Sequence, residues 1–166
     1  MQPISLARPQ LLNAIWAMHD VKGFLDDNDI AQLSTLFGVS AVEIEGVVSF
    51  YHFFHRQPSG RHTIYLNNSI VSEINGFEEV RRAFEKETGA ALGKVDATGT
   101  FGFYETSCIG LSDQEPAALV DFCPVVELTP QKVKTIVAKL KSGAAIGSVC
   151  DEPKNNIRYT PGERTF

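Results

Sequence analysis

The segment Pro58-Ser59-Gly60-Arg61-His62-Thr63-Ile64-Tyr65-Leu66 marks a change in the pattern of the chain. Its first three residues are typical of a loop, because proline, serine and glycine interrupt regular structure. The β-branched and aromatic residues that follow, up to Leu66, are typical of a strand. Apolar residues recur at helical spacing before this segment. We therefore expect an N-terminal helical bundle over residues 1–57 and an α/β domain over residues 58–147.

The helical bundle is predicted from its start and stop signals. Gly23 and Gly38 each follow an apolar helical stripe and are expected to end a helix. Residues 26–28, Asp-Asp-Asn, are good caps for the second helix. Ser40 and Glu43 have the spacing of a capping box, in which the glutamate reaches back to the cap. The third helix is expected to carry Val47, Phe50, Tyr51 and Phe54 on one face.

The α/β domain is predicted to alternate strands with helices. The expected elements, in order, are a strand at 62–66, a helix with Phe77, Val80 and Phe84 on one face and Asn75 as its cap, a strand at 100–104, two strands within 119–128 separated by Pro124, and a helix that begins at Thr129-Pro130 and ends at Gly143. This order favours a small sheet with helices on its faces. Residues 148–166 are polar and contain turn residues, so we expect a C-terminal linker or arm.

Composition excludes several classes of function. The chain has 166 residues and a net charge of −5 without a basic run, so neither nucleic acid nor an anionic membrane surface is an expected partner. No apolar stretch is long enough to span a bilayer, and no signal peptide is visible, so we expect a cytoplasmic protein. Cys108, Cys123 and Cys150 are too scattered for a disulfide framework. They are expected to be reduced thiols, with Cys123 in the core and Cys150 in the tail.

Two blocks of the sequence resemble one known family. The first, from Gly23 to Asn67, includes Val47-Val48-Ser49-Phe50-Tyr51 and Pro58-Ser59-Gly60-Arg61-His62; the second is Cys108-Ile109-Gly110-Leu111-Ser112-Asp113-Gln114-Glu115-Pro116. In this order they resemble the thioredoxin-like [2Fe-2S] ferredoxin family, which includes the small NADH-module subunit of respiratory complex I. The resemblance implies a thioredoxin-like fold after the helical bundle. The second block is most similar to the N-terminal ferredoxin-like domain of the diaphorase flavoprotein subunit of NAD-reducing [NiFe] hydrogenases. Residues 156–166 are similar to the linker that enters the flavin domain of those proteins.

The family binds its cluster through two pairs of cysteines with the spacings C-x4-C and C-x3-C. These pairs supply the four thiolates that a [2Fe-2S] cluster needs. The resemblance places the first pair at Asn67 and Ser72 and the second at Cys108 and Ser112, so one of the four positions is a cysteine. A serine hydroxyl is far less acidic than a cysteine thiol, whose pKa is about 8.5, and is a poorer ligand. We therefore expect no metal and no cofactor to be bound by this chain itself.

The resemblance then implies a supporting role rather than an electron-carrying one. We expect an accessory, cluster-free ferredoxin-like subunit or domain, a non-catalytic part of an NAD-linked oxidoreductase of the hydrogenase or NADH dehydrogenase type. Its implied partners are a flavin- and NAD-binding diaphorase domain or subunit and further iron–sulfur hydrogenase subunits, which would hold the FMN, the NAD and the clusters. Two alternatives remain open. One is a [2Fe-2S] electron carrier with unusual ligands, and the other is a thiol-dependent thioredoxin-like redox protein that uses Cys108.

The run Phe50-Tyr51-His52-Phe53-Phe54 has more aromatic residues than one helical face of a small unit can bury. Its Phe and Tyr residues, Phe50, Tyr51, Phe53 and Phe54, are candidates for a partner interface, with packing between the two units as the alternative. His52 and His55 have the i, i+3 spacing of a metal edge but no obvious third ligand, so we expect them to pack. His19 and His62 belong to no recognisable constellation. No Gly-x-Gly-x-x-Gly or Walker pattern is present, so NAD binding by this chain is not expected.

Overall fold

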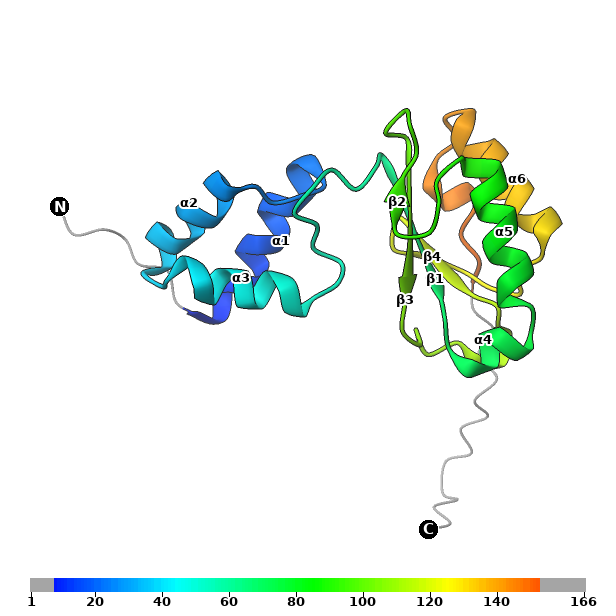
Figure 1. Ribbon diagram of the computed structural model, residues 1–166, viewed down its shortest axis with the longest axis horizontal. Helices are drawn as coiled ribbons and strands as arrows, with labels where there is room; N and C mark the ends of the chain where they lie inside the picture. Colours follow the sequence, from blue (N-terminus) through cyan, green and yellow to red (C-terminus); the bar gives the residue numbers. More distant parts are fainter. Residues whose placement is uncertain (1–7, 153–166) are drawn as a thin grey trace, which may run out of the picture.

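The structure is a computed structural model that describes residues 8–152, and these form two units joined by a short linker (Figure 1). The N-terminal unit, coloured blue to cyan, is built from helices. The C-terminal unit is a sheet with helices packed on it. Each unit has its own cluster of buried apolar side chains, and the two clusters share no residue. The predicted order of a helical bundle followed by an α/β domain is therefore observed.

The helical unit consists of one short 3₁₀ turn and three α-helices. They are η1 (Arg8–Gln10), α1 (Leu11–Lys22), α2 (Asp27–Phe37) and α3 (Ala41–Phe50). The predicted stops Gly23 and Gly38 follow α1 and α2 with φ values of 78° and 63°, a left-handed conformation that glycine adopts at little cost. Asp26 caps α2 and forms a reciprocal capping box with Asp29. The apolar faces of the three helices then meet in the core of the unit.

Two predictions about the third helix are wrong in detail. The Ser40 hydroxyl accepts from the backbone amide of Glu43 at 3.2 Å, but the Glu43 carboxylate pairs with Arg8 at 2.6 Å instead of completing a capping box. The helix also ends at Phe50, because the backbone of Tyr51 is extended. Phe54 therefore does not continue the apolar face of α3. The helical spacing of apolar residues continues beyond α3 to Phe54, but Phe54 lies in a loop, where its ring packs on Trp16.

The α/β unit has five strands in the order β2-β3-β1-β4-β5. In chain order its elements are β1 (His62–Asn67), α4 (Ile70–Ile74), α5 (Phe77–Thr88), β2 (Lys94–Val95), β3 (Phe101–Thr106), η2 (Ser112–Gln114), β4 (Ala118–Val120), β5 (Cys123–Val125), α6 (Pro130–Lys141) and η3 (Ile146–Ser148). The central strand β1 runs parallel to β3, and the remaining neighbours are antiparallel. Because β1 and β3 are parallel, their carboxyl ends, Asn67 and Thr106, lie side by side.

Several details of the α/β unit differ from the sequence predictions. The short elements α4 and β2 were not predicted. Asn75 ends α4, and α5 begins after Gly76. The last two strands are separated by a turn at Asp121 and Phe122, whose φ values are 47° and 63°, and not by Pro124. Pro124 lies within β5, where a proline is tolerated because β5 is an edge strand.

The two faces of the sheet have different characters. Side chains alternate along a strand, so Ile64 and Phe103 point to the face covered by α5 and α6 (Figure 1), where they join the aliphatic core. Tyr65 and Tyr104 point to the opposite face, where their rings stack with centroids 5.5 Å apart. Aromatic and histidine side chains of the helical unit reach this second face, as the 5.0 Å separation of the Phe53 and Tyr65 rings shows.

The linker at Ser59 contacts both units. Its hydroxyl donates to the carbonyl of Gly23 at 2.8 Å, and its carbonyl accepts from the Tyr104 hydroxyl at 3.2 Å. Gly102 of β3 lies directly against it, because a Cβ at Gly102 would come within 1.9 Å of the Ser59 carbonyl oxygen. Glycine is therefore required at position 102, and the linker packs directly against the face of the sheet that carries Tyr65 and Tyr104.

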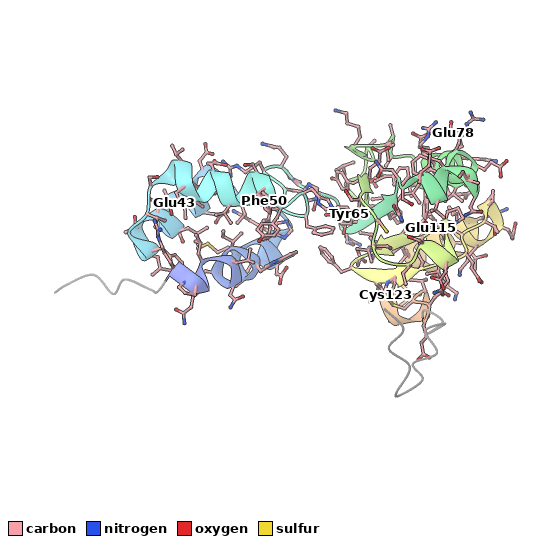
Figure 2. All side chains as sticks on the ribbon, turned by 90° about the horizontal axis from the view of Figure 1, so that it is seen from below. Glu43, Phe50, Tyr65, Glu78, Glu115 and Cys123 are labelled. Atoms are coloured by element: carbon pink, nitrogen blue, oxygen red, sulfur yellow. A yellow bond between two sulfur atoms is a disulfide. The ribbon has the colours of Figure 1, made fainter. Side chains whose placement is uncertain are left out.

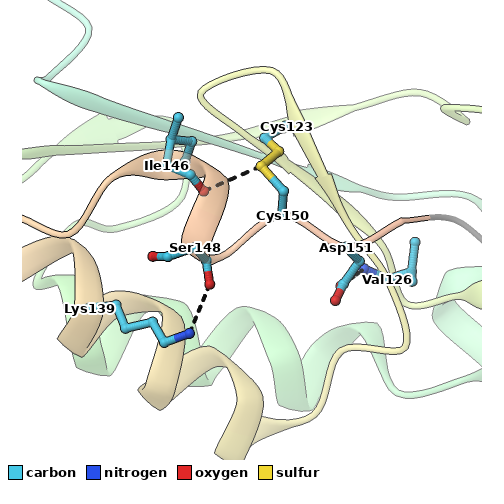
Figure 3. Close-up of a disulfide and its surroundings, with 7 residues drawn as sticks. All are labelled: Cys123, Val126, Lys139, Ile146, Ser148, Cys150 and Asp151. Atoms are coloured by element: carbon cyan, nitrogen blue, oxygen red, sulfur yellow. Dashed lines mark hydrogen bonds between the residues drawn. A yellow bond between two sulfur atoms is a disulfide. The ribbon is translucent and has the colours of Figure 1, made fainter.

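Cys123 and Cys150 form a disulfide, with Cα atoms 5.5 Å apart (Figure 3), so the prediction that they are reduced thiols is wrong. After α6 the chain returns to the β5 edge, where the backbone amide of Asp151 donates to the carbonyl of Pro124 at 3.0 Å. Val149 is buried in the core of the α/β unit. The predicted arm therefore begins later than residue 148. Residues 153–166, which include the linker-like segment 156–166, lie outside the described residues.

No single helix within residues 8–152 is both long and apolar enough to cross a membrane. Only α2 and α3 taken together reach the required length and composition, and this pair is bent by 115° at its break.

Candidate functional site

The four positions that match the family's cluster ligands lie in the loops that follow β1 and β3. Asn67 is the last residue of β1 and lies in register with Thr106, the last residue of β3. The backbone amide of Asn68 donates to the carbonyl of Thr106 at 3.0 Å, so the two loops leave the sheet together. Ser72 belongs to α4 in the first loop. Cys108 follows in the second loop, so one edge of the sheet carries the whole candidate site.

The first pair of positions is buried. Asn67 and Ser72 are both 0% exposed. The Asn67 side chain accepts from the backbone amide of Ser69 at 2.9 Å through Oδ1 and donates through Nδ2 to Glu115 Oε1. The Ser72 hydroxyl has no hydrogen-bond partner of ordinary geometry. These two side chains are therefore enclosed within the fold, and both the oxygen and the nitrogen of the Asn67 amide are hydrogen-bonded.

Glu115 is the residue of this site that sequence reasoning missed. It comes from the second loop, is 9% exposed, and lies inside the α/β unit (Figure 2). Its Oε2 accepts from the backbone amide of Ala117 at 2.7 Å. Burial raises the pKa of the Glu115 carboxyl, and the hydrogen bond from the backbone amide of Ala117, followed by smaller contributions that include that of Asn67, opposes the rise. A glutamate before a proline gave no signal in the sequence that it would reach Asn67, 48 positions away.

The second pair of positions is open to solvent. Cys108 Sγ lies 3.3 Å from Ser112 Oγ and accepts from the backbone amide of Gly110 at 3.4 Å. Cys108 is exposed and Ser112 is exposed. The hydrogen bond with Ser112, followed by that from Gly110, lowers the pKa of the Cys108 thiol below its ordinary value. The second loop thus holds one accessible thiol with increased thiolate character.

These side chains do not fit a [2Fe-2S] cluster. The positions offer one thiol, an exposed hydroxyl, a buried hydroxyl and an amide that is already hydrogen-bonded, whereas two ferric ions bridged by sulfide call for four soft anionic ligands. Cys123 and Cys150 are bonded to each other and cannot substitute. Nor does any group of three or more His, Cys, Asp or Glu residues in the described part of the chain have the arrangement of a metal site.

The histidines of the aromatic run serve the junction between the two units. His52 and His55 lie beyond α3, so they do not share a helical face. The His52 Nε2 lies 2.9 Å from the Thr106 hydroxyl, and the His55 Nε2 lies 2.7 Å from the Tyr65 hydroxyl. Burial, with smaller contributions from the neighbouring histidines, lowers the pKa of His55 to about 4. Both rings contact the sheet, as their expected packing role requires.

The other two histidines have surroundings that sequence reasoning did not find. His62 Nδ1 lies 2.7 Å from Asp121 Oδ2, so His62 does have a partner. His19 is buried between the rings of Trp16 and Phe54, and its Nε2 has no hydrogen-bond partner. Burial lowers the pKa of His19. Neither environment is visible as a motif, because the His62–Asp121 and His19–Phe54 contacts each join separate segments of the chain.

The aromatic interface candidates divide into three groups. Phe54 is 6% exposed and packs on Trp16, with ring centroids 4.7 Å apart, so it is unavailable to a partner and is withdrawn as an interface candidate. Phe53 packs between the units against Tyr65. Phe50 and Tyr51 are 78% and 38% exposed and line an apolar groove of about 590 Å³ on the helical unit. These last two remain candidates for a partner surface.

A three-helix unit followed by a five-stranded α/β domain, with paired ligand-type loops at the ends of its parallel strands, defines a thioredoxin-like ferredoxin architecture. The sequence agrees, because the model of the thioredoxin-like [2Fe-2S] ferredoxin family matches residues 3–141. The chain belongs to this family. Of the four positions that the resemblance assigns to cluster ligands, only Cys108 is a cysteine.

The most informative relatives are components of NAD-linked oxidoreductases. The chain is 41% identical to the NAD-reducing hydrogenase HoxS subunit alpha of Cupriavidus necator over 92% of its own length, but spans 26% of that relative's length. It is 30% identical to one of the subunits of the NADH-quinone oxidoreductase of Escherichia coli, with 81% of each chain covered. Among solved structures, an NAD⁺-reducing [NiFe]-hydrogenase in the H₂-reduced state matches with a TM-score of 0.74 and 29% identity, over 88% of this chain and 24% of the other. The chain thus spans about a quarter of the hydrogenase chains that it matches.

Proposed function

We propose that this chain is an accessory, cluster-free domain or subunit that supports the flavin- and NAD-binding diaphorase module of an NAD-reducing hydrogenase-type complex. Its similarity to the HoxS subunit alpha and to a component of NADH-quinone oxidoreductase supports the role as part of a complex. In this proposal FMN, NAD and iron–sulfur clusters are bound by partner domains, and electrons pass through those domains and not through this chain.

The observation that carries the proposal is the state of the ligand positions. Asn67 is enclosed in the fold and hydrogen-bonded to Glu115, so it cannot be turned toward iron without loss of that hydrogen bond, and the buried Ser72 offers a hydroxyl where a cluster calls for a thiolate. Only Cys108 retains the thiol that a cluster requires. An electron carrier needs a redox centre, and the donors of this site do not make one.

The contact with the diaphorase module is proposed to involve the exposed pair Phe50 and Tyr51. Large apolar side chains at 78% and 38% exposure, gathered at a groove, are typical of a protein interaction surface. Neither nucleic acid nor a membrane has a part in this proposal.

The proposed location is the cytoplasm, and cell fractionation tests it: recovery of the chain with the soluble cytoplasmic proteins supports the location, and recovery elsewhere contradicts it. The state of the cysteine pair in the cell is a separate question. Cytoplasmic cysteines are normally held as thiols, whereas Cys123 and Cys150 are within bonding distance. Trapping of free thiols in intact cells, followed by mass spectrometry, measures the state of this pair directly. A protected pair shows that the disulfide of the structure forms in the cell, and complete modification of both cysteines shows that it does not.

Replacement of Cys108 by Ala in the assembled complex tests the supporting role. The expected result is unchanged assembly and nearly unchanged NADH-dependent dye reduction, because the thiol carries no electron. A large loss of turnover with intact assembly contradicts the proposal. Phe50→Ala, a truncation on the helical unit, is the comparison: it removes an exposed ring of the proposed contact surface and is expected to weaken assembly.

One observation favours a thiol-dependent function as a second candidate. Cys108 is exposed, and hydrogen bonds from Ser112 and Gly110 lower its pKa, as in reactive cysteines. The described residues supply no second cysteine near it, so dithiol chemistry of the thioredoxin type has no partner thiol here. If Cys108→Ala abolishes a thiol-dependent reduction by the isolated chain, this second candidate replaces the first.

A further inference from the structure

The two ligand loops are joined by a side chain that belongs to neither family ligand pair. Glu115 lies in the second loop, and its carboxylate accepts from Asn67 Nδ2 in the first loop and from the backbone amide of Ala117 in its own. Asn67 in turn fixes its own loop by accepting from the backbone amide of Ser69 at 2.9 Å. The chain of contacts therefore runs without interruption from one loop to the other.

A neighbouring pair of the same residue types provides a built-in comparison. Asn68, the residue directly after β1, donates through Nδ2 to Glu105 Oε2 of β3, but at 3.4 Å and with both side chains exposed. The Asn67–Glu115 pair is buried, where water does not compete for its donors and acceptors. A buried carboxylate without donors is strongly unfavourable, so the donors around Glu115 are required for its position.

We propose that the Glu115 carboxylate takes over the bridging role of a cluster, holding the loop after β1 to the loop after β3 from within the protein. This inference rests on the proposed cluster-free state of the chain. In a cluster-bearing site, iron ligated from both loops fixes their separation. Here one carboxylate, with an amide side chain on one side and a backbone amide on the other, ties the same two loops at the position of the lost ligand Asn67.

The backbone contacts of the loops show where a loss of this bridge is measurable. The amide of Asn67 donates to the carbonyl of Ala117, and that of Asn68 donates to Thr106, each at 3.0 Å. These two hydrogen bonds cross between the loops. If Glu115 holds the loops together, its removal increases hydrogen exchange at Asn67, Asn68 and Ala117 at once. If Glu115 is only a satisfied side chain of its own loop, exchange changes near Ala117 alone.

The experiment compares Glu115→Ala with Glu105→Ala in the full chain, by thermal unfolding and by hydrogen exchange. We expect Glu115→Ala to lower Tm by about 5 °C or more and to speed exchange on both loops at least about tenfold, because it leaves buried donors unpaired. Glu105→Ala is expected to change neither, because its partner is exposed. Equal behaviour of the two variants overturns the proposal, as does faster exchange confined to the second loop.

Two further variants cover the case in which Glu115→Ala does not fold. Glu115→Gln keeps the volume and one acceptor oxygen, so it is expected to fold with an intermediate loss of Tm. In the double variant Asn67→Ala/Glu115→Ala the loss of Tm is expected to be smaller than the sum of the single losses, because the two residues act as a pair. Strict additivity of the two losses overturns the proposal.

Iron content, measured on the same wild-type preparation, separates this inference from the proposed function. About two irons per wild-type chain would remove the proposed function, and the bridging inference with it. Iron-free wild-type protein with an inert Glu115→Ala variant would remove only the bridging role.

Discussion

The first and second halves of the candidate ligand site differ in what surrounds them. Asn67 and Ser72 are fully buried, and Asn67 is held by Glu115, whereas Cys108 and Ser112 remain exposed on a loop with one thiol. The first half therefore contributes to the stability of the fold. The second half is an exposed loop that offers one thiol, that of Cys108, where the family pattern has two. Under the proposed cluster-free state, internal hydrogen bonds would occupy the first half of the ligand site, so that this half would not be empty.

The largest effect is expected from rebuilding the site. A variant with Asn67→Cys, Ser72→Cys, Ser112→Cys and Glu115→Ala presents four thiols at the family spacings and removes the carboxylate between the loops. After reconstitution with ferrous iron and sulfide, it is expected to bind about two irons per chain and to absorb visible light. Iron and acid-labile sulfide analysis checks this.

The control for the rebuilt site is the same variant with Cys108→Ala, which leaves three thiols and is expected to bind far less iron. Equal iron in both, or none in either, would mean that these four positions do not form one site.

Cleavage of the disulfide is the next largest effect and acts away from both halves. Cys123 and Cys150 are 27 residues apart, and a bridge of that length stabilises by about 3.5 kcal/mol in the loop-entropy model. Urea unfolding with and without a dithiol reductant measures this loss. The midpoint should fall, while hydrogen exchange at Asn67 and Asn68 in native buffer should change little; increased exchange there would show that the bridge also holds the ligand loops.

A third test contrasts the two halves directly by single substitutions. Asn67→Ala leaves a buried carboxylate without one of its donors and is expected to reduce the free energy of unfolding by about 2–3 kcal/mol. Ser112→Ala is expected to change it by less than about 0.5 kcal/mol, because both members of its hydrogen bond are exposed. Asn68→Ala is the matched exposed control for Asn67. Similar losses for Asn67→Ala and Ser112→Ala would remove the distinction between the halves.

The smallest effect concerns the reactivity of Cys108. Ser112 is the main cause of the lowered pKa of this thiol, so Ser112→Ala should raise that pKa. The thiolate fraction at pH 7 then falls, and alkylation by iodoacetamide should slow by about two- to fivefold, with the midpoint of the pH–rate profile shifted to higher pH. Ser107→Ala, an exposed serine beside the same cysteine, is the control. An unchanged profile in Ser112→Ala would mean that the hydrogen bond has no effect on the thiol.

Sequence reasoning succeeded where the signal is local. The helix stops at Gly23 and Gly38 and the cap at Thr129 depend on residues within one turn, and all three were predicted. The family spacing is also local, and the structure has the four positions that it assigns after β1 and β3; their role as ligand positions stays a prediction. The end of the third helix was not predicted, because the apolar spacing of residues 50–54 continues past Phe50 into a loop. The ring of Phe53 in that loop packs on Tyr65, on the face of the sheet opposite α5 and α6.

What the sequence did not reveal depends on contacts between distant segments. Glu115 reaches Asn67 across 48 positions, and Cys123 reaches Cys150 only because the chain after α6 returns to the β5 edge. His62 and Asp121 meet across 59 positions because β1 pairs with β4, and Asp121 directly follows β4. In each case the residue types alone carry no pairing information, so the tertiary structure was needed to find the partner.

Iron and acid-labile sulfide, determined with a visible spectrum on anaerobically purified wild-type protein, test the cluster-free state most directly. With Asn67 and Ser72 enclosed and Cys108 the one thiol at the ligand positions, we expect near-zero iron, near-zero sulfide and a featureless visible spectrum. About two irons and two sulfides per chain, with visible absorbance that bleaches on reduction, would contradict this and make the chain an electron carrier with unusual ligands.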